Sequence, residues 1–129
     1  MMKTNIYLPR GTVAVVGACL EATHPEGYAK IAAMADEVYT LCLEETHINM
    51  AVTKIAAMLS TGRVERLIFA SVDRSPHCTQ LHYIKHEIER TMELTIPVES
   101  YVVPDKEPVL VSDKAIDMSK SLSKLAAIF

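Results

Sequence analysis

The sequence predicts a three-layer α/β fold, in which a mostly parallel sheet of four or five strands carries helices on both faces. Three observations lead to this prediction. Short Val- and Ile-rich runs lack polar alternation, which is typical of strands buried on both faces. Segments with apolar residues at helical spacing alternate with these runs along the chain. Glycine, proline and capping residues separate the two kinds of segment.

The first half of the chain contains two strand–helix pairs. Residues 12–17 form a Val-rich run that ends at a glycine and predict the first strand. A helix is expected over residues 25–35, because proline is favoured in a first helical turn and the apolar positions recur at helical spacing. Residues 38–43 predict the second strand. Residues 48–59 carry an apolar stripe and predict a helix that ends before Gly62.

The second half of the chain repeats this alternation and then adds a short strand. Residues 67–72 are the most apolar segment and predict the third strand. The next helix is expected over residues 76–92, with Ser75 as its cap. Residues 97–103 and 109–111 predict a fourth strand and a short fifth one.

The order of these elements predicts the topology. A final helix is expected over residues 113–129. The right-handed crossover rule then favours a flavodoxin-like, doubly wound sheet with strand order 2-1-3-4. Because no linker or repeat interrupts the pattern, residues 1–129 are expected to form a single α/β domain.

Composition excludes several classes of protein. Half of the 129 residues are hydrophobic and 22% are charged, which excludes wholesale disorder. A net charge of −3 gives no reason to expect nucleic acid or an anionic membrane as a partner. No apolar run approaches the roughly 18–20 residues that span a bilayer. The N-terminus does not resemble a signal peptide, and three cysteines without an export signal predict a cytoplasmic protein with free thiols or thiol ligands.

The absence of several motifs narrows the function further. Neither the glycine-rich dinucleotide fingerprint G-x-G-x-x-G nor the phosphate-binding loop G-x-x-x-x-G-K-[ST] occurs. Ordinary dinucleotide and nucleoside triphosphate binding are therefore disfavoured. A G-x-S-x-G nucleophile elbow is absent, and so is a C-x-x-C pair of the thioredoxin or structural zinc type.

The chemically active side chains gather where strands end. Open parallel sheets bind ligands beyond the carboxyl ends of their strands, so residues there are the candidates for a site. All three cysteines and three of the five histidines lie in these segments, together with an aspartate: Cys19, His24, Cys42, His47, Asp73, His77 and Cys78. Two explanations of the clustering stay open, namely chance and one site assembled from several loops. Cys42 alternates with leucines within a predicted strand, which is also typical of a cysteine that is simply a buried apolar residue.

The first hypothesis is a thiol-centred or metal-centred site. Cys78 falls in the first turn of a predicted helix, where unpaired N–H groups and the helix dipole favour a thiolate, and His77 beside it can carry a proton. In one version these two residues are catalytic. In the other, Cys19, Cys78, His77 and His82 bind a metal, and the candidate cofactors are zinc, iron or an iron–sulfur cluster. His86, one turn further along, is expected to be a solvated surface residue.

The second hypothesis is a small-molecule-binding regulatory module. The starts of the helices after the second and third strands would hold an anionic metabolite through Thr46, Arg74 and Ser75, and Asp73 would anchor a ligand hydroxyl, a metal or a histidine. A flavin phosphate would fit the same scheme, and flavin ranks below a metal as the expected cofactor.

The third hypothesis is an accessory subunit that docks on a larger enzyme or forms a homo-oligomer through the C-terminal helix. That helix has an apolar stripe at spacings of three and four residues. Such a stripe usually packs on the domain's own sheet, and if the sheet is already covered it offers a partner surface. The stripe consists of Ala115, Met118, Leu122, Leu125 and Phe129. The sequence leaves open whether the protein is an enzyme.

Overall fold

The computed structural model describes residues 1–75 and 78–128, and of Cys78 it describes only the backbone. Five strands and six helices are found in this part of the chain. In chain order they are β1 (Gly11–Gly17), α1 (Leu20–Thr23), α2 (Pro25–Ala33), β2 (Glu37–Leu41), α3 (Ile48–Ser60), β3 (Val64–Val72), α4 (Cys78–Thr91), β4 (Val98–Val103), β5 (Val109–Val111), α5 (Asp113–Ser119) and α6 (Leu122–Ala126).

The strands form one sheet in the order β2-β1-β3-β4-β5. The first four strands are parallel, and β5 pairs antiparallel with β4. The predicted fold class and the 2-1-3-4 order are therefore confirmed, and the short fifth strand extends the sheet at one edge. Because β1 lies between β2 and β3, the carboxyl ends of these three strands are neighbours.

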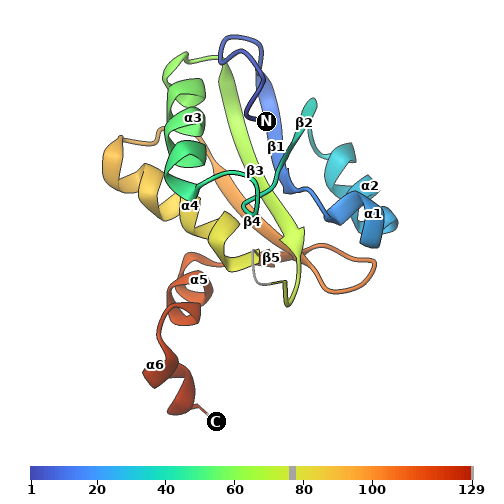
Figure 1. Ribbon diagram of the computed structural model, residues 1–129, viewed down its shortest axis with the longest axis vertical. Helices are drawn as coiled ribbons and strands as arrows, with labels where there is room; N and C mark the ends of the chain where they lie inside the picture. Colours follow the sequence, from blue (N-terminus) through green and yellow to red (C-terminus); the bar gives the residue numbers. More distant parts are fainter. Residues whose placement is uncertain (76–77, 129) are drawn as a thin grey trace.

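Helices cover both faces of the sheet and make it the middle of three layers (Figure 1). Helices α3 and α4 lie on one face, where their apolar side chains pack with Val13, Val15, Leu67 and Phe69. Helices α1 and α2 are shorter and lie on the other face, where Leu20 and Ile31 pack with the alternate residues of β1 and β3. Residues 13–16 and 67–70 of these two strands have no exposed surface, as expected for central parallel strands.

Two local details differ from the sequence prediction near the carboxyl ends of the strands. Strand β2 ends at Leu41, so Cys42 lies outside the strand. The Cys42 carbonyl instead accepts a hydrogen bond from the Thr46 N–H at 3.0 Å and begins a turn. An additional short helix, α1, precedes α2 and starts directly after Cys19.

The predicted C-terminal helix is broken into α5 and α6, and we refer to residues 112–128 as the C-terminal arm. The Ser119 hydroxyl donates to the Ile116 carbonyl at 2.6 Å, and serines of this kind compete with the helical backbone for hydrogen bonds. The helix ends there and restarts after Ser121. Only Ile116 of the arm is buried, so its expected packing on the sheet by an apolar stripe is wrong. In Figure 1 the arm extends away from the rest of the domain.

We predict that Gly27→Ala destabilises the protein, because Gly27 sets the close approach of α2 to the sheet. A methyl group at this buried position would collide with the side chain of Val103. Overpacking of this kind costs about 1–3 kcal/mol. Urea unfolding measures the change, and at an uncrowded helix position the same substitution would stabilise by roughly 0.5–1 kcal/mol. A rise in the free energy of unfolding would therefore contradict the packing described here.

Candidate functional site

A pocket lies where β1, β2 and β3 end, and we refer to it as the thiol pocket. Its free volume is about 50 Å³, which accommodates an ion and one or two water molecules. Its walls are mostly apolar, and they include the two cysteines whose side chains the structure describes. The lining residues are Gly17, Ala18, Cys19, Leu20, Leu41, Cys42, Leu43, Glu44, Ser71, Val72, Ser75 and Leu81.

The sheet positions Cys19 and Cys42 at the thiol pocket. The Ala18 N–H donates to the Leu41 carbonyl at 3.1 Å, which joins the ends of β1 and β2 one residue before each cysteine. The Cys19 carbonyl accepts from the N–H and the hydroxyl of Thr23, which fixes the first turn of α1. Cys19 is exposed and Cys42 is half-buried, and both are free thiols. The sequence left open whether the cysteines meet, and the structure places Cys19 and Cys42 in the wall of one pocket.

Charge in the thiol pocket favours cations over anions. Glu44 is the one charged residue among the described residues that line it. No lysine, arginine or histidine of the described chain lies in the wall, whereas anion sites in proteins normally supply such groups. Ser75 lies on the other side of the pocket, and α4 begins three residues later at Cys78. His77 and the Cys78 side chain lie outside the described part of the chain, so their predicted catalytic and metal-binding roles stay predictions.

The four residues predicted to bind a small ligand are divided among different places. Ser75 lines the thiol pocket. Asp73 lines a second cavity, which lies between α4, β4, β5 and α5. Thr46 lines a shallow hollow beside the N-terminal residues. Arg74 is exposed and has a φ of 66°, a left-handed conformation that turns the chain between β3 and α4.

A buried hydrogen bond connects the third strand with α4 beneath the thiol pocket. The Ser71 hydroxyl and His82 Nε2 are 2.9 Å apart, and both side chains are almost fully buried. Burial lowers the pKa of His82 from 6.5 to about 4, and the backbone carbonyl of Tyr101 acts in the opposite direction. His82 is therefore neutral at physiological pH. Sequence reasoning missed Ser71, although a serine within an otherwise apolar strand run is a visible signal.

The Ser71–His82 pair is suited to positioning rather than to nucleophilic catalysis. A histidine with a pKa near 4 is a weak general base at neutral pH. Its other nitrogen, Nδ1, is buried and no described carboxylate is hydrogen-bonded to it, and the Tyr101 backbone is the polar group that raises the pKa of the ring. His82 also lines the cavity that contains Asp73. The pair holds the Ser71 hydroxyl at the wall of the thiol pocket.

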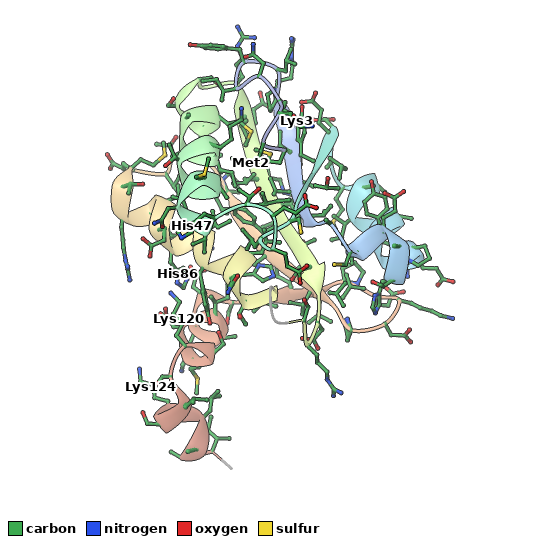
Figure 2. The ribbon with its side chains drawn as sticks, viewed as in Figure 1. Met2, Lys3, His47, His86, Lys120 and Lys124 are labelled. Carbon is green, nitrogen blue, oxygen red and sulfur yellow. The ribbon has the colours of Figure 1, made fainter. Side chains whose placement is uncertain are left out.

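Two other histidines have structural contacts. His47 caps α3, because its Nδ1 accepts a hydrogen bond from the Asn49 N–H at 3.1 Å. The prediction that His86 is solvated is wrong, because its side chain is only 10% exposed. The C-terminal arm covers it, and Lys120 Nζ lies 2.8 Å from His86 Nδ1 (Figure 2). The sequence could not reveal this because the arm's packing on α4 is a tertiary contact.

Within residues 1–75 and 78–128, side chains of His, Cys, Asp and Glu do not form a group of three that could hold a metal ion. Cys19 and Cys42 belong to these described residues, whereas His77 and the Cys78 side chain do not. None of the described helices is both long and apolar enough to cross a membrane.

Comparison with known proteins agrees with this architecture. A family model described as a Rossmann-like domain matches residues 7–127, and the chain therefore belongs to that family. No curated protein and no solved structure matches the chain. Because folds of this kind host many unrelated functions, the function has to be argued from the site itself.

We predict that acidification destabilises the protein through His82. Because the folded-state pKa is about 4 and the unfolded value is 6.5, only the unfolded chain binds a proton between these values. The contribution of neutral His82 is complete above about pH 6.5 and is lost as the pH falls towards 4, by on the order of 3 kcal/mol. Urea unfolding at several pH values measures this loss.

His82→Gln provides the control for this prediction. The variant cannot take up the proton, so the difference in stability between wild type and variant should shrink as the pH falls. Parallel pH dependences in the two proteins would show that His82 is not held neutral by burial.

Proposed function

We propose that this Rossmann-like domain binds a soft metal ion through cysteine thiolates at the carboxyl edge of its sheet. The observation that carries the proposal is the shared pocket of Cys19 and Cys42, which come from the ends of neighbouring strands. Thiolates select zinc, copper(I) and iron–sulfur centres. Cys78, at the start of α4, is the third proposed ligand, and His77 beside it is the fourth.

Charge and size support a metal in preference to the anion-binding alternative. Glu44 and two thiolates would give the thiol pocket a negative charge that a cation neutralises and that a phosphate would oppose. The free volume of about 50 Å³ suits an ion, whereas drug-sized ligands occupy pockets of roughly 300–1,000 Å³. His82 is less suitable than Cys42 as a ligand, because its Nε2 is bonded to Ser71 and its Nδ1 is buried.

The apolar wall supports the same proposal. Leu20, Leu41 and Leu81 lie in the wall of the pocket together with the two cysteines. Few polar groups line such a wall, so the two sulfurs are its principal candidate ligands for a soft ion. Ser71 lies in the wall of the thiol pocket and is fixed there by its hydrogen bond with His82, as outer residues are at metal sites.

Metal analysis of the full chain tests the proposal. Protein purified under nitrogen without chelators is expected to contain near-stoichiometric zinc or iron, and an absorbance spectrum distinguishes the two. If it is isolated without metal, Co²⁺ titration should give the near-ultraviolet absorbance of cobalt–thiolate bonds. Cys19→Ser and Cys42→Ser should each lose most of the metal or most of this absorbance.

Met50→Ser is the matched control, because it removes an exposed sulfur on α3 that lies outside the thiol pocket. This variant should bind metal as the wild type does. Metal binding that survives Cys19→Ser and Cys42→Ser, or a wild type that binds no zinc, iron or Co²⁺, would overturn the proposal.

A further inference from the structure

The C-terminal arm is held on the domain by the buried side chain of Ile116 and by a few polar contacts. Lys85 Nζ lies 2.6 Å from the Asp113 carboxylate, and the hydroxyls of Tyr83 and Ser119 are 3.3 Å apart. Lys120 adds its contact with His86. These contacts fix α5 on α4, and the arm beyond them has no buried residue. In Figure 2 Lys120 lies beside α4, while Lys124 lies further out along the arm.

Helix α6 and the residues that follow it expose large apolar side chains. Leu122 is 81% exposed and Ile128 is 62% exposed, while Leu125 is half-buried. A helix of five residues is too short to be stable without tertiary packing. Its formation and its apolar surface therefore indicate a partner that covers it.

Strand β5 adds exposed apolar surface where the arm begins. Val109 and Leu110 are adjacent residues of this strand, so their side chains point to opposite faces of the sheet. Both are exposed, at 47% and 61%. Strand β5 is also an edge of the sheet, and one residue, Ser112, separates it from α5. The exposed strand and the exposed helix thus belong to one continuous segment.

The charges of the arm are complementary to a second arm in antiparallel orientation. Asp113, Lys114 and Asp117 give residues 112–119 a net charge of −1, and Lys120 and Lys124 give residues 120–128 a net charge of +2. Asp117 is 67% exposed, and Lys124, seven residues later, forms no ion pair with any described residue. A two-fold axis between two antiparallel arms would place Asp117 of each copy opposite Lys124 of the other. The same surface on each copy would then supply both members of two identical ion pairs.

We propose that the C-terminal arm and strand β5 form a two-fold interface between two copies of this chain. The apolar side chains of α6 pack against the partner's arm and β5, and the Asp117–Lys124 pairs fix the antiparallel orientation. This inference does not depend on the thiol pocket, because no residue of the arm or of β5 lines that pocket.

Analytical ultracentrifugation of the full chain over a range of concentrations tests the proposal. The wild type should associate to twice its 14.3 kDa mass. Leu122→Glu places a charge in the interface and should raise the dissociation constant about tenfold or more, which corresponds to 1.4 kcal/mol. Met50→Glu is the matched control, because it places the same charge at an exposed apolar residue of α3 and should leave the dimer intact.

A charge exchange tests the orientation of the arms. Asp117→Lys and Lys124→Asp should each weaken the dimer several-fold, because like charges then face each other across the axis. The double variant restores opposite charges and should recover most of the affinity. Asp117 Oδ1 lies 3.4 Å from His86 Nδ1 in its own chain, so recovery in the double variant is the informative readout.

Circular dichroism separates loss of association from loss of folding. Leu122→Glu should retain the helix content and the unfolding temperature of the dilute wild type, because Leu122 is not part of the core. A wild type that keeps its single-chain mass at every concentration would overturn the proposal. A Leu122→Glu variant that dimerises as the wild type does would also overturn it.

Discussion

The parallel pairing of β1 with β3 is the constraint on which the rest of this structure depends. Both strands are fully buried over residues 13–16 and 67–70, so each must be covered on two faces. Their alternate side chains face two different helical layers, and a parallel connection requires a crossover helix. The same pairing brings the carboxyl ends of β1, β2 and β3 together, and the thiol pocket is the space between those ends.

The centre of the sheet and its β5 edge differ in how well they are covered. At β1 and β3 the helices enclose the strands, and the buried polar side chains of Ser71 and His82 are hydrogen-bonded to each other. At β5 the sheet ends in exposed Val109 and Leu110, and the arm that follows is held by ion pairs and hydrogen bonds. Apolar burial therefore stabilises the part that positions the thiols, while apolar side chains at and beyond β5 stay exposed.

Some features of the candidate site could be predicted from the sequence, and others depend on the tertiary structure. Cys19 and Cys42 could be assigned to one edge from the sequence, because the strand order follows from the alternation of elements. The separation of Asp73 from Ser75 could not be predicted, because the left-handed Arg74 between them sends one towards the thiol pocket and the other into a different cavity. His82 and His86 look alike in sequence, yet one is buried by the sheet and the other by the arm.

The sequence by itself determined the fold class, the strand order and the edge at which the thiols gather, because apolar periodicity and chain connectivity are local properties. Tertiary structure alone decided that His82 is buried and neutral and that His86 is covered by the arm, since burial depends on neighbours distant in the chain. It also decided where the C-terminal helix breaks and that its apolar residues remain uncovered. A stripe of apolar side chains indicates that a helix face is suited to burial, and only the packed structure shows whether the rest of the domain covers it.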